Sequence, residues 1–207
     1  MIIIRAPLRI SFVGGGTDLK EFYSHYPGRV ISATINKFIY IAVNPAHFLN
    51  QCIIKYTETE VAKHPSEFKH PLFREALIKM GINNGIEIAS FADLPAKTGL
   101  GSSSSFSVAL FKALFTHLGK PVSKREAAEA ASELEIDILK EPIGKQDQYA
   151  AAFGGFNIFQ FNGDGTVTVE PIFLDFRVRS ALENHLLLYF TGITRSAGSV
   201  LSDQKSK

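Results

Sequence analysis

Stretches rich in Ile, Val, Phe and Tyr alternate with polar segments along the first half of the chain. Four of these stretches carry many β-branched or aromatic residues: 1–13, 30–43, 52–56 and 86–92. Such side chains favour extended backbone, so we predict strands there. The first stretch has Pro7 between Arg5 and Arg9, and we therefore expect either a pair of strands or one bent strand.

Apolar residues at helical spacing occur between and after these stretches. A short helix is predicted around Pro71–Met80, after a polar segment that begins at Glu58. A longer helix begins in the serine run Ser102–Ser105 and ends at Gly119. Its apolar residues nearly encircle the helix axis, which is typical of a helix buried between two layers.

A further predicted helix begins at Ser123. Glu126 follows three positions later, and this pair is typical of a capping box. Apolar residues then recur at helical spacing over residues 127–138. Pro142 and Gly144 are expected to end the helix.

The last part of the chain returns to strand-forming stretches. We predict strands at residues 156–161, 166–174 and 186–191, the first two joined by an Asn-Gly-Asp-Gly turn at 162–165. The polar segment from Ser196 is expected to begin another helix. Strands that occur in runs, with helices between only some of them, predict an α+β fold.

The composition is globular and excludes several classes of partner. Of 207 residues, 45% are hydrophobic and 20% charged, and 22 basic against 20 acidic side chains give a net charge of +2. Such a charge is too small to indicate nucleic acid or an anionic membrane as a partner. The chain has 1 cysteine, Cys52, which excludes an intrachain disulfide and suits a reducing compartment.

No segment of the sequence predicts secretion or membrane insertion. Arg5 interrupts the apolar start of the chain, and the longest uncharged runs contain Pro, Asn, His, Gln or Gly. We therefore expect a cytoplasmic protein. The length permits one large or two small domains, and no change of composition marks a linker between them.

The strongest candidate for chemistry is segment 94–105, Leu-Pro-Ala-Lys-Thr-Gly-Leu-Gly-Ser-Ser-Ser-Ser, between a predicted strand and the predicted buried helix. Gly99 and Gly101 let the backbone approach a ligand closely. The helix start presents unpaired N–H groups and a partial positive charge, and serine hydroxyls add donors and can bind Mg²⁺. Together they predict a cradle for a polyphosphate, although the segment is neither a Walker A loop nor a dinucleotide fingerprint. A Gly/Ser cap that only starts a helix is the alternative.

Two other clusters of residues are weaker evidence for a functional site when each is considered alone. Asp147, in Gly-Lys-Gln-Asp-Gln, could act as a general base toward a hydroxyl, or it could cap a helix over residues 148–153. Arg9 and Asp18 flank the turn Gly14–Gly16, which suits a hydroxyl-rich small molecule. A surface turn with two solvated charges is the alternative at that place.

Two glutamates of the helix that begins at Ser123 are candidates for an inward-facing carboxylate. Glu135 lies beside the apolar stripe, whereas Glu133 lies further round the helix. The six histidines show no metal-ligand spacing. Neither a zinc site nor a Ser/His/Asp motif is supported.

In their order along the chain, the three clusters resemble the motifs of the GHMP small-molecule kinases, which include galactokinase, homoserine kinase and mevalonate kinase. Residues 95–105 resemble the phosphate-binding motif of that family. Residues 6–18, Ala-Pro-Leu-Arg-Ile-Ser-Phe-Val-Gly-Gly-Gly-Thr-Asp, resemble the sugar motif of galactokinases. Residues 144–155 resemble the catalytic-base region. The resemblance implies an α+β amino-terminal domain of the ribosomal S5 domain 2 type.

The resemblance also implies roles for individual residues. Asp147 would accept the proton of the substrate hydroxyl, and Arg9 would hold it ionised. Glu135, preferred to Glu133, would bind Mg²⁺ together with Ser103. The ATP phosphates would be bound by the loop and the helix start: Gly99, Leu100, Gly101, Ser102, Ser103 and Ser104. The sugar would be bound by the amino-terminal turn: Gly15, Gly16, Thr17 and Asp18.

Within the family, the chain is most similar to the branch that phosphorylates heptose 7-phosphates. This implies transfer of the γ-phosphoryl of ATP, with Mg²⁺, to the anomeric hydroxyl of such a sugar. Galactokinases have Gly-Glu-His where this chain has Gly14–Gly16. Loss of that glutamate removes a negative charge and opens volume, as a longer, phosphorylated sugar needs. A kinase for unphosphorylated fucose or galactose and an inactive nucleotide- or sugar-binding module are the alternatives.

The family also has a carboxy-terminal domain with a third glycine-rich motif. We expect residues 1–190 to form the amino-terminal domain and residues 191–207 to begin a carboxy-terminal domain that is largely absent. The expected partner is a small-molecule sugar phosphate, and a homodimer is left open.

Overall fold

The computed structural model describes residues 1–189 and residue 192. Its strands are β1 (Ile2–Val13), β2 (Gly28–Pro45), β3 (Cys52–Lys55), β4 (Thr59–Ala62), β5 (Ile86–Ala92), β6 (Phe156–Phe161) and β7 (Val167–Pro171). Its helices are α1 (Lys20–Tyr23), α2 (Pro71–Met80), α3 (Ser102–His117), α4 (Lys124–Ser132), α5 (Gln146–Phe153) and α6 (Phe176–Asn184). A 3₁₀ turn, η1 (Pro65–Glu67), and a π-helical turn, η2 (Glu133–Ile138), complete the described elements.

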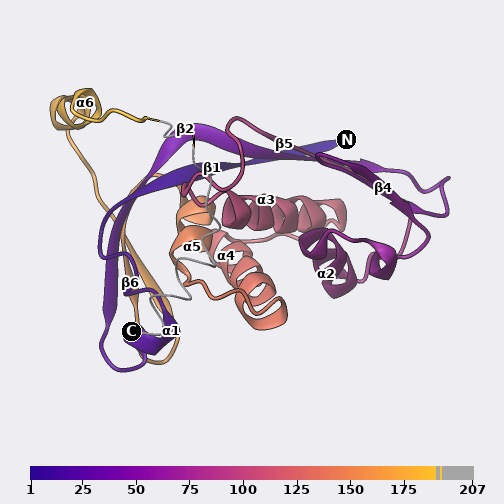
Figure 1. The fold of residues 1–207 in the computed structure, drawn as a ribbon, viewed down its shortest axis with the longest axis horizontal. Helices are drawn as coiled ribbons and strands as arrows, with labels where there is room; N and C mark the ends of the chain where they lie inside the picture. The colour runs from indigo at the N-terminus through magenta and orange to yellow at the C-terminus, as the bar shows by residue number, and fades with distance from the viewer. Residues whose placement is uncertain (190–191, 193–207) are drawn as a thin grey trace.

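The strands form one sheet in the order β4-β3-β5-β2-β6-β7, and β1 pairs along the other side of β2. The long strand β2 has two partners on one edge, because residues 39–45 pair with β5 and residues 28–33 pair with β6. The sheet bends between these two halves, and α2, α3, α4 and α5 lie on its concave face (Figure 1). This arrangement confirms the predicted α+β fold class.

Helix α3 lies at the centre of the molecule and packs against β1, β2, α4 and α5. Side chains on several of its faces are buried, including Val108, Leu110, Phe111 and Leu114. Burying one such side chain stabilises a protein by about 1.5–3 kcal/mol. The prediction of a helix buried between layers is therefore confirmed, and its first turn is fixed in place by the core.

Strand β1 is one bent strand, which was one of the two alternatives that its sequence left open. Its register with β2 shifts between Pro7 and Arg9. At this irregularity the backbone N–H of Arg9 donates to the carbonyl of Leu100 at 3.1 Å, and not to β2. Ser105 Oγ of α3 also donates to the Pro7 carbonyl at 2.8 Å. The bend of β1 therefore attaches the strand to the segment before α3 and to α3 itself.

The helix predicted from Ser123 is present, but its second half is a π-helix and it ends at Ile138, before Pro142. The capping box of Ser123 and Glu126 is present, but α4 ends at Ser132 and the wider η2 turn follows. The backbone N–H of Leu139 donates to the carbonyl of Leu134, five residues back. A wider turn rotates the residues that follow relative to an α-helix. Ile138, expected on the apolar stripe, is consequently 38% exposed.

Other differences concern short or late elements. The strand predicted at 166–174 ends at Pro171, and prolines cannot donate to a sheet. The strand predicted at 186–191 is not found in its described part, where residues 186–189 have no regular structure. Four short elements were not predicted from the sequence: β4, α1, η1 and α6. The helix expected from Ser196 lies outside the described residues.

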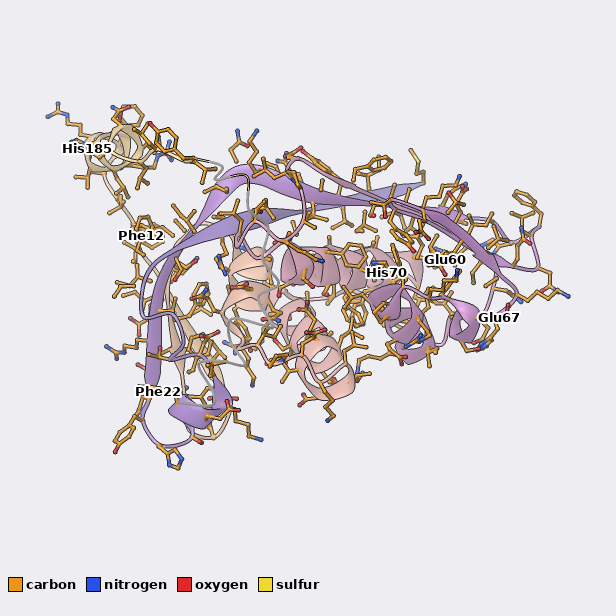
Figure 2. All side chains as sticks on the ribbon, viewed as in Figure 1. Phe12, Phe22, Glu60, Glu67, His70 and His185 are labelled. Atoms are coloured by element: carbon orange, nitrogen blue, oxygen red, sulfur yellow. The ribbon has the colours of Figure 1, made fainter. Side chains whose placement is uncertain are left out.

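Helix α6 lies apart from the other helices, beside His185 (Figure 2). Asp175 caps it by accepting a hydrogen bond from the Arg177 N–H at 2.8 Å, and none of its side chains is buried. The expected division at residue 190 stays a prediction. In the part of the chain that the structure describes, no helix has both the length and the apolar character needed to span a membrane.

Candidate functional site

The first turn of α3 presents free backbone donors. Gly101 precedes the helix with φ +75°, in the left-handed region that favours glycine, and no side chain caps the helix. The N–H of Ser105 donates to the Gly101 carbonyl at 2.9 Å. Among the described residues, the N–H groups of Ser102, Ser103 and Ser104 have no acceptor. Three N–H groups at a helix start are therefore available to an anion.

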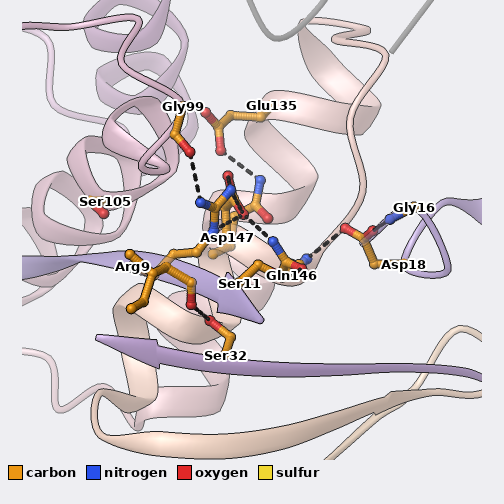
Figure 3. Close-up of polar contacts among 12 residues, drawn as sticks. Arg9, Ser11, Gly16, Asp18, Ser32, Gly99, Ser105, Glu135, Gln146 and Asp147 are labelled. Atoms are coloured by element: carbon orange, nitrogen blue, oxygen red, sulfur yellow. Dashed lines mark hydrogen bonds and ion pairs between the residues drawn. The ribbon is translucent and has the colours of Figure 1, made fainter. Parts of the chain in front are cut away.

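Arg9 and Asp147 form a two-point ion pair beside this turn (Figure 3). Arg9 Nε donates to Asp147 Oδ1 at 2.7 Å, and Arg9 Nη2 donates to Asp147 Oδ2 at 2.8 Å. The exposed fractions of the two side chains are 13% and 26%. Asp147 lies within the first turn of α5 and Lys145 occupies the cap position, so the alternative in which Asp147 caps the helix is excluded.

The ion pair is also joined to the loop before α3. Arg9 Nη1 donates to the carbonyl of Gly99 at 2.9 Å. A Cβ placed on Gly101 would lie 3.2 Å from Asp147 Oδ2, which shows how close the carboxylate is to the helix start. The structure thus brings the predicted base, the predicted arginine and the predicted phosphate loop together.

Glu135 is a buried carboxylate at the same place. It is 1% exposed, Ser103 Oγ donates to its Oε1 at 2.7 Å, and Gln148 Nε2 donates to its Oε2 at 2.7 Å. Burial raises the pKa of the Glu135 carboxyl above its ordinary value. No Lys, Arg or His of the described residues pairs with it. Glu133, in contrast, has a side chain that is 51% exposed and pairs with Lys79.

The glycine turn is held against α5 by Asp18. This residue is 8% exposed, its Oδ1 accepts from the Gly16 N–H at 3.1 Å, and its Oδ2 accepts from the Gln146 N–H at 3.1 Å. Burial raises the pKa of the Asp18 carboxyl. Thr17 Oγ1 donates to the carbonyl of Gly14 at 2.8 Å. The alternative of a surface turn with two solvated charges is therefore wrong, because Asp18 and Arg9 both have protein partners.

The oxygen atoms around Glu135 suit a magnesium ion. A buried carboxylate without a countercharge is costly unless a cation neutralises it. Magnesium prefers oxygen ligands, and it is commonly held by one or two carboxylates together with the phosphates of a substrate. Ser103 Oγ and the Glu135 carboxylate supply such oxygens next to the free N–H groups of α3.

Comparison with known proteins assigns this arrangement to a family. Residues 68–155, which include the loop, Glu135 and Asp147, match the family described as GHMP kinases N terminal domain. A curated relative from Campylobacter jejuni, named D-glycero-alpha-D-manno-heptose 7-phosphate kinase, is 32% identical over 98% of this chain. Over residues 68–155, the chain matches a GHMP kinase N-terminal domain.

Solved structures share the fold of this GHMP kinase N-terminal domain. A Bacteroides thetaiotaomicron protein, named D-glycero-D-manno-heptose 1-phosphate kinase, superimposes with a TM-score of 0.85 at 28% identity, over 100% of this chain and 70% of that one. A Lactococcus lactis galactokinase with bound galactose superimposes with a TM-score of 0.67 at 19% identity, over 84% of this chain and 47% of that one, and shows the fold alone. The chain spans 63% of the length of the Campylobacter relative.

Three residues of the candidate site were not predicted from the sequence. Gln148 holds Glu135, as described above, and Ser11 and Gln146 form a contact beside Asp147. The sequence position of each of these residues could have indicated that it lies near the site. Ser11 follows Arg9 by two positions and so lies on the same face of β1. Gln146 and Gln148 flank Asp147 directly in the sequence.

Proposed function

We propose that this GHMP kinase N-terminal domain belongs to a sugar kinase that uses ATP and Mg²⁺ and phosphorylates the anomeric hydroxyl of a heptose 7-phosphate. The observation that carries the proposal is the Arg9–Asp147 ion pair beside Gly101, at the open start of α3. A base and a phosphate cradle that share one site are what phosphoryl transfer to a hydroxyl requires.

Asp147 is the general base in this proposal. The O–H bond of the acceptor breaks, the proton moves to the Asp147 carboxylate, and the acceptor oxygen forms the new bond to the γ-phosphorus while the bond to ADP breaks. Arg9 carries a permanent positive charge that keeps Asp147 ionised before the transfer. The N–H groups at the start of α3 stabilise the charge that spreads over the phosphoryl oxygens.

Glu135 and Ser103 are the residues that would hold Mg²⁺. The ion would supply neutralisation of the phosphate charges. Gln148 Nε2 and Ser103 Oγ each hold one oxygen of Glu135, so the orientation of the carboxylate is set by the protein. The buried position of Glu135 excludes water, which strengthens its interaction with any cation.

The choice of a heptose phosphate as substrate rests on the relatives and on the glycine turn. Two of the relatives, at 32% and 28% identity, are named as heptose phosphate kinases, one for a 7-phosphate and one for a 1-phosphate. A Cβ added at Gly15 would meet no atom of the described residues within 4 Å, so these residues leave space beside the turn. That space and the missing glutamate suit a longer sugar that carries a negative charge.

A kinase for an unphosphorylated sugar is the second candidate. It is favoured by a Thermotoga neapolitana galactokinase, 24% identical over 73% of this chain, and by an Arabidopsis thaliana bifunctional fucokinase, 27% identical over 96%. The third candidate is an inactive module that binds only the nucleotide or the sugar.

One experiment separates these candidates. Sugar-dependent formation of ADP is measured for the full chain with a heptose 7-phosphate, the unphosphorylated heptose, galactose and fucose, and thermal stability is measured with and without Mg-ATP. Our proposal predicts turnover with the 7-phosphate above the other sugars. Faster turnover with galactose or fucose supports the second candidate. Stabilisation by Mg-ATP without ADP formation from any sugar supports the third.

A further inference from the structure

Gln146 connects the glycine turn to Asp147. Its backbone N–H donates to Asp18 Oδ2 at 3.1 Å, and its side-chain Nε2 donates to Asp147 Oδ1 at 3.0 Å. Figure 3 shows Gln146 between the two carboxylates. Gln146 is only 6% exposed, so solvent does not compete strongly for these contacts.

Ser11 sets the orientation of the Gln146 side chain. Ser11 Oγ donates to Gln146 Oε1 at 3.1 Å. An amide has one accepting end and one donating end, and with its oxygen at Ser11 its nitrogen faces Asp147. Ser11 and Arg9 come from the same face of β1, so one strand sets the positions of both donors to the carboxylate.

The two oxygens of Asp147 are consequently not equivalent. Oδ1 accepts from Arg9 Nε at 2.7 Å and from Gln146 Nε2 at 3.0 Å, and Arg9 Nη2 also lies 2.7 Å from it, so no lone pair of Oδ1 is left for a substrate. Oδ2 accepts from Arg9 Nη2 at 2.8 Å and retains a lone pair. Oδ2 is also the atom of Asp147 that lies nearest the start of α3, since a Cβ placed on Gly101 would be 3.2 Å from it.

We infer that Gln146 is a positioning residue, which occupies Oδ1 of Asp147 and so directs the proton of the acceptor hydroxyl to Oδ2. This inference rests on the proposed function, in which Asp147 is the base. The charged groups around Asp147 are Arg9 from β1, Asp18 from the glycine turn and Glu135 from η2. Gln146 is a neutral donor among them, so it can direct the carboxylate without changing the net charge of the site.

Two variants test this role. Gln146→Met keeps the length of the side chain and removes the amide, while the backbone N–H that donates to Asp18 is retained. Ser11→Ala leaves the amide in place and removes the group that orients it. Gln160→Met is the matched control, because it makes the same change in a glutamine that accepts a hydrogen bond from Arg29 on β2 and lies outside the site.

Kinetics and NMR spectra of the full chain provide separate readouts. We expect Gln146→Met to lower kcat by about 10-fold with an unchanged KM for ATP, Ser11→Ala to give a smaller loss in the same direction, and Gln160→Met to have no effect. In ¹⁵N spectra, we expect the side-chain amide signal of Gln146 to be shifted in Ser11→Ala and in Asp147→Ala relative to the wild type.

The outcomes distinguish this inference from the function on which it rests. Equal kcat for Gln146→Met and Gln160→Met overturns the positioning role, as do Gln146 amide signals that respond to neither substitution. A wild-type chain that shows the expected amide shifts but forms no ADP with any sugar overturns the proposed function, while the contact between Gln146 and Asp147 is supported.

Discussion

Arg9 and Asp147 lie 138 positions apart in the sequence and meet in a two-point ion pair, with Arg9 Nε on Oδ1 and Arg9 Nη2 on Oδ2. Each partner of this ion pair is also fixed by a second part of the site. The backbone N–H of Arg9 donates to Leu100 of the phosphate loop, and Asp147 lies in the first turn of α5. A change in the loop, in β1 or in α5 therefore acts on the same carboxylate.

Gly101→Ala tests the closeness of the loop to Asp147. The new methyl group would lie 3.2 Å from Asp147 Oδ2, and φ +75° is a strained conformation for alanine, at a cost of about 1–2 kcal/mol. We expect both a lower free energy of unfolding and a strong loss of kcat. Gly119→Ala is the control, because its φ is +65° and its Cβ would meet nothing within 4 Å. It should lose similar stability and retain kcat; equal kcat for the two variants contradicts the account.

Glu135→Gln and Glu133→Gln separate the two candidate metal ligands. Glu135 is buried beside Ser103, whereas the Glu133 side chain is exposed and pairs with Lys79. Loss of a residue that only supports a metal ligand lowers metal affinity by roughly 10-fold or more. We therefore expect Glu135→Gln, which removes a ligand itself, to weaken the Mg²⁺-dependent part of ATP binding by at least that factor. Titration calorimetry with and without Mg²⁺ measures the Mg²⁺-dependent part of the ATP affinity in each variant. Magnesium dependence that is lost in Glu133→Gln and kept in Glu135→Gln reverses the assignment.

Gly15→Glu tests whether the glycine turn selects a phosphorylated sugar. The substitution restores the acidic residue that galactokinases carry in this motif, at a position where a side chain meets nothing within 4 Å. A new negative charge repels a sugar phosphate, so KM for a heptose 7-phosphate should rise far more than KM for the unphosphorylated sugar. Gly15→Ala, which adds no charge, should change neither strongly. Equal increases for both sugars in Gly15→Glu are incompatible with this role.

The burial of His70 predicts that the free energy of unfolding depends on pH, independently of the candidate site around Asp147. Its ring packs against Phe73 and Phe106, its Nδ1 is buried without a partner, and Glu60 lies nearby (Figure 2). Burial lowers the pKa of the His70 imidazole below 6.5, despite the opposing effect of Glu60. The unfolded chain then binds the proton more tightly, so the stability contribution is present above pH 6.5 and is lost as the pH falls towards the lowered pKa.

Denaturant unfolding at pH 7.5 and pH 5.5 measures this effect. The wild type should lose more free energy of unfolding between the two pH values than His70→Phe, which keeps a ring in the cluster and cannot be protonated. Parallel changes in the two proteins would show that His70 does not carry the dependence.

The parts predicted from the sequence are those that depend on local pattern. The serine run, Gly99 and Gly101 mark a helix start whatever the rest of the chain does, and the apolar residues of α3 indicate burial on all sides. Ser123 and Glu126 identify a cap by their spacing alone. The roles of Arg9 and Asp147 came from the resemblance, because alone each had a plausible structural alternative.

The parts that were missed depend on tertiary contacts or on departures from regular geometry. The η2 turn was not expected because its residues fit α-helical spacing until Ile138. Nothing local indicates that Ser11 faces Gln146, 135 positions away. Asp18 was expected to bind a sugar, which stays a prediction, and nothing local indicated that its carboxylate would hold the glycine turn to α5.

The central claim is tested most directly by sugar-dependent ADP formation in Asp147→Asn, measured together with ATP affinity. The account predicts that turnover falls by roughly 10²–10⁴-fold, the contribution of a positioned base, while the full chain binds ATP as tightly as the wild type. Turnover at the wild-type rate in Asp147→Asn would contradict it.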